Sequence, residues 1–290
     1  MSKLISPKQF ARAIDVSEST VKRWVDNGSI HAVKTAGGHR RLSVDVALRF
    51  ARDHGHQLVR PETIGLPTVT QRTPNAITQE RTALIESLVS GNEEASRQII
   101  LDLYLARHSL AVICDEVVAP AFCEIGNRWA CGEVEVYMER RACELCLRLL
   151  HNIRDLVPSP GPEAPVALGC TLDGDPYTLA ACMASLVLRD AGWNASSLGN
   201  MLPFTTIRRA IERERPKLVW LSVSTIRTQD RFVDEMNETV DLALQHGTAI
   251  AIGGRGLTPP LREKLRYSAF CETFQQLTTT AASLAPTSRR

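Results

Sequence analysis

The sequence predicts a multidomain protein with an N-terminal winged helix-turn-helix, a central four-helix bundle and a C-terminal doubly wound α/β domain with a parallel sheet. Three observations predict this order. Residues 1–56 contain short capped helices and a basic hairpin, residues 76–157 are almost continuously helical, and residues 166–277 alternate apolar strands with helices. Such alternation is typical of a parallel sheet covered by helices on both faces.

Two short helices are expected at the start of the chain. Ser6-Pro7 predicts the start of the first, because serine caps a helix and proline fits its first position. Ser17 is the expected N-cap of the second helix, and Asn27-Gly28 is expected to end it, because glycine tolerates the left-handed conformation. Two helices joined by a short turn at Asp15-Val16 form a helix-turn-helix, whose second helix usually enters the major groove of DNA.

A basic hairpin is expected after the second helix. Residues 30–33 predict a short strand, Gly37-Gly38 a tight turn, and Ser43 the cap of a third helix over 44–53. We expect polar side chains of the second helix to face a groove and basic side chains of the hairpin to touch phosphates. The candidate DNA-contacting residues are Ser19, Thr20, Lys22, Arg23, His39, Arg40 and Arg41.

Charge is divided unevenly along the chain. Residues 1–60 hold 11 Lys and Arg against 5 Asp and Glu, and the other 230 residues hold 23 against 27. A basic module attached to an acidic body is typical of a DNA-binding regulator. The sequence has no apolar run of membrane-spanning length and no signal-peptide core, and its 8 cysteines are expected to be reduced. We therefore expect a cytoplasmic protein associated with the bacterial nucleoid, with no membrane partner.

Prolines mark the expected domain boundaries. Residues 57–75, with Pro61, Pro67 and Pro74, are expected to form a linker, and residues 158–165, with four prolines, a second one. Between them, helices broken near glycines would form a bundle over 76–157. The expected bundle helices are 76–90, 92–107, 109–130 and 133–156.

The C-terminal region predicts a Rossmann-like domain over 166–277 and a loose tail at 278–290. Strands are expected at 166–170, 194–198, 218–223, 248–252 and 271–274. Helices are expected at 176–191, 203–214, 230–245 and 257–265.

The N-terminal motif resembles the MerR family of winged-helix regulators. The resemblance rests on Trp24 in the recognition helix, Gly28 after it, and Gly-Gly-His-Arg-Arg at 37–41 in the wing. It implies binding to double-stranded operator DNA. Because one such head covers one short half-site, useful specificity implies a homodimer or a higher homo-oligomer.

The whole chain resembles the CarH/LitR photoreceptor regulators, which hold adenosylcobalamin between a helix bundle and a Rossmann-like sheet. The matching landmarks are Asn127-Arg128-Trp129, Gly132-Glu133-Val134, Glu139, Gly174-Asp175, Gly192-Trp193, Ser222-Val223-Ser224 and Gly253-Gly254. The resemblance implies repression released by light, a serine-lined channel for the cofactor's nucleotide tail, and paired glycines that let this tail approach the backbone. The implied cofactor-binding residues are Trp129, Glu139, Asp175, Tyr177, Ser222, Ser224, Gly253 and Gly254.

Both positions that carry cobalt-ligating histidines in that family are occupied by other residues. Aligning the motif on Asp175 places Tyr177 at the first ligand, and Arg140 stands at the second. A guanidinium has no free lone pair, and a phenol ionises too little at neutral pH to be a good ligand. Three interpretations stay open: cobalamin held without histidine, another ligand such as haem or a different tetrapyrrole, or a ligand-free body that forms oligomers or binds a protein partner.

The sequence therefore predicts a sequence-specific transcription regulator, most simply a repressor, and not an enzyme. It has no P-loop, nucleophile elbow or zinc-protease helix, so no catalytic residue is expected. Cys143 and Cys146 have the spacing of a metal pair, but they lie in a helical pattern without a second Cys or His pair, so no metal site is expected. The alternative class is a non-specific DNA-architectural protein.

Overall fold

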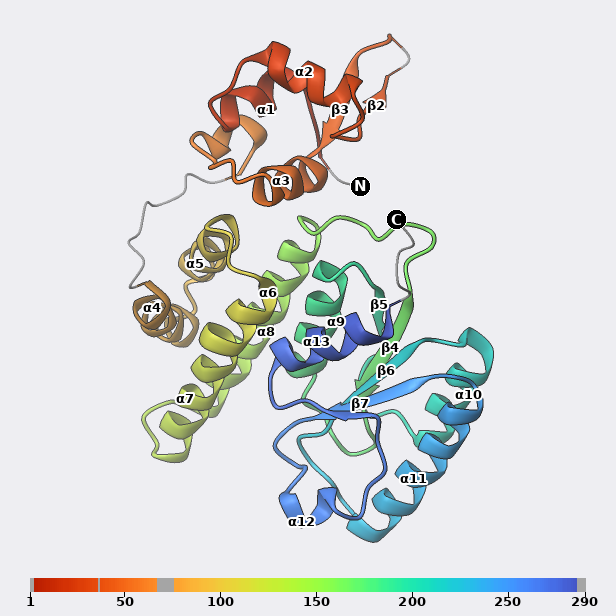
Figure 1. The fold of residues 1–290 in the computed structure, drawn as a ribbon. Coiled ribbons are helices and arrows are strands. Elements are labelled where there is room, and N and C mark those ends of the chain that lie inside the picture. Colours follow the sequence, from red (N-terminus) through yellow and green to blue (C-terminus); the bar gives the residue numbers. More distant parts are fainter. Residues whose placement is uncertain (1–2, 36, 67–75, 286–290) are drawn as a thin grey trace. The chain divides into compact units, whose positions relative to one another are not determined.

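Figure 1 shows the computed structural model, which describes residues 3–35, 37–66 and 76–285. The chain divides into two compact units. One contains residues up to 109 together with 116–158, and the other contains 110–115 together with residues from 159 onward. No helix in the described ranges is both long enough and apolar enough to cross a membrane.

The first unit begins with a small domain of helices and a three-stranded antiparallel sheet. Its first helix starts at a capping box, in which the Ser6 hydroxyl accepts from the Gln9 N–H at 3.2 Å and the Gln9 side chain accepts from the Ser6 N–H at 2.9 Å. Phe10, Val21 and Leu48 from three helices meet in its core. The elements are β1 (Leu4–Ile5), α1 (Pro7–Ala13), α2 (Glu18–Asp26), β2 (Val33–Lys34), β3 (Arg40–Ser43) and α3 (Val44–Asp53), with strand order β1-β3-β2.

Two details of this domain correct the sequence-based expectation. The strand expected at 30–33 is β2, two residues long, because Ile30 is buried in the core and does not pair. Ser43 stands at the N-cap of α3, but its side chain makes no capping hydrogen bond.

The expected linker at 57–75 also begins too early. Pro61–Ile64 form a 3-10 helix (η1) that contacts α1, and Ile64 is buried. Proline suits the first position of a helical turn, and the isoleucine at its end fills the domain core. The remainder of the expected linker, 67–75, lies outside the described residues.

Helices make up the rest of the first unit. α4 (Ala76–Ser90), α5 (Glu93–Leu105), α7 (Ala119–Ala130) and α8 (Val136–Arg154) pack on one another. The helix expected over 109–130 is divided into α6 (Leu110–Ile113), a π-helical turn (η2, Cys114–Val118) and α7. Pro120 contributes to this irregularity, because it cannot donate a backbone hydrogen bond to the preceding turn. Residues 110–115 group with the second unit, so the expected third bundle helix is shared between the units.

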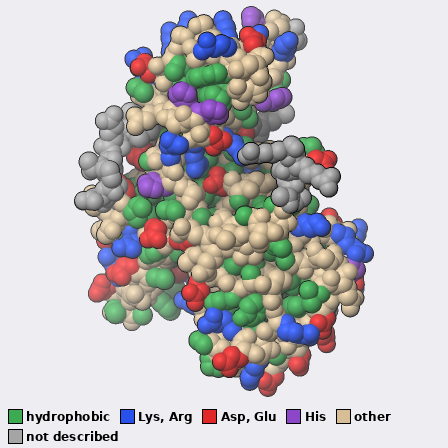
Figure 2. Space-filling view, viewed as in Figure 1, with side chains coloured by type: hydrophobic (Ala, Val, Ile, Leu, Met, Phe, Trp, Pro, Cys, Tyr) green, Lys and Arg blue, Asp and Glu red, His purple; other side chains and the backbone are tan. Residues whose placement is uncertain are grey.

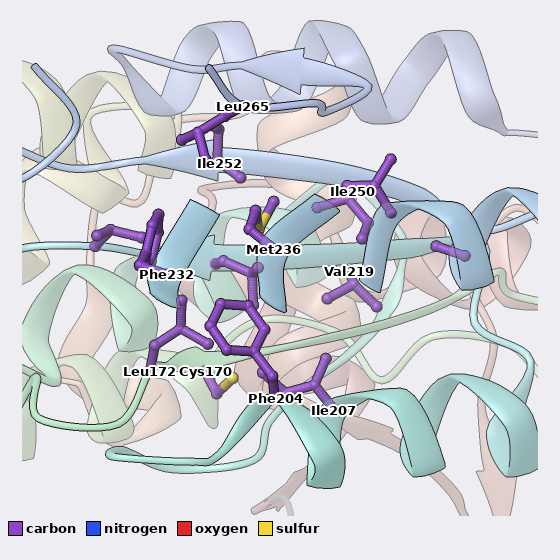
Figure 3. Close-up of a cluster of buried hydrophobic side chains, with 14 of the residues drawn as sticks. Cys170, Leu172, Phe204, Ile207, Val219, Phe232, Met236, Ile250, Ile252 and Leu265 are labelled. Atoms are coloured by element: carbon purple, nitrogen blue, oxygen red, sulfur yellow. The ribbon is translucent and has the colours of Figure 1, made fainter. Parts of the chain in front are cut away.

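The second unit is a five-stranded parallel sheet of order β5-β4-β6-β7-β8, with helices on both faces. α9 and α13 cover one face, and α10 and α11 cover the other, where Phe204, Phe232 and Met236 pack on the strands (Figure 3). The expected parallel α/β sheet is thus confirmed. The elements are β4 (Val166–Thr171), α9 (Leu179–Asp190), β5 (Asn194–Ser197), α10 (Phe204–Glu214), β6 (Leu218–Ser222), α11 (Gln229–Gln245), β7 (Ala249–Gly253), α12 (Pro259–Arg262), β8 (Ala269–Phe270) and α13 (Phe274–Leu284).

Three expected elements of this unit change their bounds. The helix expected from residue 176 begins at Leu179, because the preceding loop is held by the Asp175 carboxylate. The helix expected at 257–265 shortens to α12, and the strand expected at 271–274 becomes β8, which pairs with β7 two residues earlier.

The loose tail expected at 278–290 is wrong over 278–284, which belong to α13. Thr273 caps this helix by accepting from the Gln276 N–H at 3.1 Å, and Leu277 and Ala281 are buried against the sheet. The Asp115 carboxylate accepts from the N–H groups of the first two α13 residues at 2.8 and 3.0 Å. Residues 286–290 lie outside the described part of the chain.

Candidate functional sites

α2 has one buried face and one exposed polar face. Val21 is buried, and the Trp24 ring packs at 4.9 Å from the Phe50 ring, measured between centroids. Lys22 and Arg23 point away from this core and are exposed. In the view of Figure 2, Lys, Arg and His side chains are numerous on this N-terminal domain. An exposed helix face with two cations can contact DNA.

The predicted polar residues of α2 belong to its N-terminal cap. The Ser17 hydroxyl accepts from the Thr20 N–H at 3.1 Å and lies 2.8 Å from the hydroxyls of both Ser19 and Thr20. Lys22 pairs with Glu18 at 2.9 Å, and this hydrogen bond holds the pKa of the Glu18 carboxyl below its usual value. These contacts fix the first turn of α2 in one conformation.

The hairpin β2–β3 is tied to α2 by an ion pair that the sequence alone does not indicate. Arg40 lies 2.5 Å from Asp26, the last residue of α2, and is only partly exposed. At the hairpin tip, the Thr35 N–H donates to the His39 carbonyl at 2.9 Å, while His39 itself is exposed. Arg41 pairs with Val33 in the strand register. Arg40 therefore orients the hairpin as well as offering a positive charge.

In the second unit, Asp175 joins two loops at the carboxyl edge of the sheet. The side chain is fully buried, and its carboxylate accepts from the N–H groups of Tyr177 at 3.1 Å, Ser224 at 2.5 Å and Thr225 at 3.2 Å. The Thr171 hydroxyl donates to the Asp175 carbonyl at 2.5 Å. β4 and β6 are neighbouring strands, and the loops that follow them lead to helices on opposite faces of the sheet. Asp175 therefore joins these two loops at the point where parallel α/β sheets usually bind ligands.

Exposed apolar side chains lie on the loops that follow β4 and β5. Tyr177, Leu198 and Met201 are 36%, 37% and 47% exposed. The Arg255 guanidinium carbon lies 5.3 Å from the centre of the Tyr177 ring. The position expected for a cobalt ligand therefore holds a phenol beside a cation. Within the described ranges, no group of three His, Cys, Asp or Glu side chains could hold a metal ion.

The glycines at the end of β7 are explained by contacts within the protein. A Cβ on Gly254, at φ +117°, would overlap the Val223 carbonyl, and a Cβ on Gly253 would lie 2.6 Å from the Cys271 carbonyl oxygen. Ser222, on the adjacent strand, is 7% exposed, and its hydroxyl has no hydrogen-bond partner among the described residues. The glycines thus permit close backbone packing, whether or not a ligand approaches them.

Trp220, which no sequence motif indicates, is buried on one face of the sheet. It is 3% exposed and stands opposite Gly169 in the β4–β6 register. A Cβ on Gly169 would overlap the Trp220 ring, so the indole lies directly on the glycine backbone. Because Gly169 and Trp220 are 51 positions apart in the sequence, their contact can be recognised only when the register of β4 and β6 is known.

The remaining candidate residues, Trp129 and Glu139, belong to the first unit. Trp129 is 51% exposed near the end of α7. Glu139, in the first turn of α8, accepts from the Cys143 thiol at 3.4 Å and lies 3.4 Å from the Arg140 guanidinium. Burial and the adjacent Glu139 raise the pKa of the Cys143 thiol to about 12. The structure thus places Asp175, Tyr177, Ser222, Ser224, Gly253 and Gly254 at one sheet edge, while Trp129 and Glu139 lie in the other unit.

Comparisons with known proteins bear on the helical part of the first unit and on the fold of the chain. Residues 80–153 match the family model described as the B12 binding domain. The HTH-type transcriptional repressor CarH of Myxococcus xanthus is 28% identical over 155 residues, which are 53% of this chain and 51% of that protein. The match therefore spans about half of the relative's length.

Among solved structures, the monomethylamine corrinoid protein of Methanosarcina barkeri is similar with a TM-score of 0.56 and 15% identity. The likeness covers 72% of this chain and 100% of that protein. At this identity the likeness shows the fold alone: the chain shares the helical and parallel α/β architecture of a corrinoid protein.

Proposed function

We propose that the chain is a sequence-specific transcription repressor, whose N-terminal winged helix-turn-helix binds operator DNA and whose remaining body is a B12-type regulatory module. The observation that carries this proposal is the basic surface formed by α2 and the β2–β3 hairpin. Its geometry is fixed by the Ser17 cap and by the ion pair between Arg40 and Asp26. The partial identity to a repressor supports the same class of function.

DNA recognition would be divided between the helix and the hairpin. Arg23 and Lys22 on the exposed face of α2 would meet base edges or nearby phosphates, with Ser19 and Thr20 at the start of the same helix. His39, Arg40 and Arg41 would hold phosphates and so orient the helix. One domain of this size covers one half-site, so we propose that the protein acts as a homodimer or a higher homo-oligomer at the bacterial nucleoid.

The residues at the sheet edge fit a corrinoid only in part. The exposed apolar side chains of Tyr177, Leu198 and Met201 suit the face of a large ring. Neither Tyr177 nor Arg140 suits cobalt, because a phenol is a poor ligand at neutral pH and a guanidinium has no lone pair to offer. We therefore propose no ligand exchange at cobalt and no light step. The match to a B12 model favours a corrinoid over haem.

Regulation would follow from linkage between oligomeric state and DNA affinity. A ligand or protein partner that binds one assembly more tightly than another shifts the population, and DNA affinity shifts with it. Such regulation requires no large conformational change within the module. A change in oligomeric state is enough, because one DNA-binding head alone reads too short a site for specific binding.

DNA binding by the full chain tests the proposal. Fluorescence anisotropy should show that Arg40→Ala weakens binding to operator and random duplex alike and reduces the slope of log K against log salt by about 0.9, as expected for one lost phosphate contact. Arg23→Ala should cost about 1–3 kcal/mol more on operator than on random duplex. Arg213→Ala, an exposed arginine of α10, is the matched control and should change neither. Equal binding of the unaltered protein to both duplexes would instead indicate a DNA-architectural protein.

A further inference from the structure

The layer between the sheet and the helices α9 and α13 has small side chains on the strands that flank Trp220. On this face, β4 contributes Ala167 and Gly169, and β7 contributes Ala251 and Gly253. The Trp220 indole extends from β6 between them and lies on Gly169. The space that the small residues leave open beside Gly169 is therefore filled by the planar bicyclic ring of Trp220.

Two buried polar atoms in this layer have no hydrogen-bond partner. Trp220 and Ser222 are two residues apart on β6, so their side chains lie on the same face of the sheet. They are 3% and 7% exposed, and neither the indole Nε1 nor the serine hydroxyl is paired within the described ranges. Buried polar atoms are nearly always paired, so the unpaired Ser222 hydroxyl marks a place that could accept a polar group of a ligand, beside the indole that fills the layer.

We infer that Trp220 fills the slot in which the nucleotide base of a corrinoid would otherwise be buried, so that this chain holds a corrinoid through its ring alone. The inference rests on the proposed function. The stretch Ser222–Ser224 resembles the lining of a nucleotide-tail channel, and Trp220 lies two residues deeper on the same face. Indole has nearly the size and shape of a benzimidazole base, so the two cannot share the slot.

This inference gives the chain a distinctive ligand preference. A corrinoid that keeps its nucleotide outside the protein gains nothing from that nucleotide, because only buried contacts contribute strongly to affinity. Cobinamide, which lacks the nucleotide, should therefore bind as well as cyanocobalamin. Removing the indole should raise the affinity for cyanocobalamin, which carries a nucleotide base, and leave the affinity for cobinamide unchanged.

Equilibrium dialysis of the full chain against cyanocobalamin and cobinamide tests this preference. The unaltered protein should bind the two with dissociation constants within about threefold, and Trp220→Ala should bind cyanocobalamin at least about tenfold more tightly with no change for cobinamide. Trp193→Ala removes another buried indole of the same cluster and should leave the ratio unchanged. Trp220→Leu leaves a smaller void and allows the same comparison with less loss of stability. A preference of the unaltered protein for cyanocobalamin of about tenfold or more would overturn the inference.

A second measurement separates the slot from the proposed function. Free 5,6-dimethylbenzimidazole should raise the melting temperature of Trp220→Ala and not that of the unaltered protein, because only the variant has a cavity of the size and shape of this ring. If dimethylbenzimidazole stabilises Trp220→Ala but neither this variant nor the unaltered protein binds a corrinoid, the slot is supported and the corrinoid part of the proposed function is overturned. If dimethylbenzimidazole does not raise the melting temperature of Trp220→Ala, and the variant binds cyanocobalamin no more tightly than the unaltered protein does, the slot itself is overturned.

Discussion

Replacing Asp175 by alanine should destabilise the α/β unit more than any other loop substitution at the sheet edge. The carboxylate is fully buried and accepts from three backbone N–H groups, of Tyr177, Ser224 and Thr225. Hydrogen bonds to a charged group contribute about 1.5–3 kcal/mol each, and the buried donors left behind carry a desolvation cost. At the lower value, Asp175→Ala should cost roughly 4–5 kcal/mol.

Calorimetry and urea unfolding of the full chain measure this loss. For a unit of this size, each kcal/mol lowers the melting temperature by about 3–4 °C, so the transition of the α/β unit should fall by roughly 12–20 °C. Asp175→Asn retains one acceptor oxygen and should lose about half as much. Asp173→Ala, an exposed aspartate in the same loop, is the control and should change stability by less than about 0.5 kcal/mol. A loss below about 1 kcal/mol for Asp175→Ala would refute the reasoning, because the three donors would then be satisfied in another way.

Three further predictions concern packing, capping and thiol chemistry. Gly254→Ala should cost roughly 2–4 kcal/mol in urea unfolding, because the backbone has φ +117° and the new Cβ would overlap the Val223 carbonyl, whereas Gly161→Ala has open space and should cost almost nothing. Asp115→Ala should cost about 1–2 kcal/mol and speed hydrogen exchange in the first turn of α13, whose N–H groups it caps; unchanged exchange there would contradict this. Cys143, whose pKa is raised to about 12 by burial and Glu139, should stay a thiol in the folded state, so iodoacetamide should label it far more slowly than exposed Cys131 at pH 9. The folded pKa lies above the ordinary thiol value of 9.0, so this group contributes stability that is full below pH 9 and declines as the pH rises toward 12. Equal labelling of both cysteines in the folded protein would contradict the burial of Cys143.

Local signals in the sequence were sufficient for the elements that depend on neighbouring residues. The capped start of α2 at Ser17 and the apolar strands β4, β6 and β7 lie within a residue or two of their expected positions. Capping residues and apolar periodicity are properties of neighbouring residues, so these elements can be predicted without knowledge of distant contacts.

Elements that depend on distant contacts could not be predicted in this way. The sequence predicts a tail over 278–290 and misses α13, whose first N–H groups are capped by Asp115, 159 positions away from Phe274. Residues 61–64 are predicted as linker because Pro61 suggests a loop, whereas Ile64 is anchored in a core formed by earlier helices. In both segments, tertiary packing decides the structure.

The candidate sites also combine features that neighbouring residues predict with features that depend on distant contacts. The exposed cations of α2 were predicted from helical spacing alone, and their role in DNA binding stays a prediction. The ion pair of Arg40 with Asp26 and the contact of Trp220 with Gly169 depend on strand pairing and on the hairpin angle. The sequence therefore indicated the chemistry available at each site but not which side chains are already engaged by the protein itself.

The preference of the full chain for its own promoter tests the central claim most directly. Anisotropy with a labelled duplex from the promoter region and a scrambled duplex of the same composition, both at about 150 mM salt, gives the ratio of dissociation constants. The account predicts that the promoter duplex binds at least ~10³-fold more tightly, as specific regulators do. Equal dissociation constants for the two duplexes would contradict sequence-specific regulation and leave only electrostatic binding by the basic N-terminal domain.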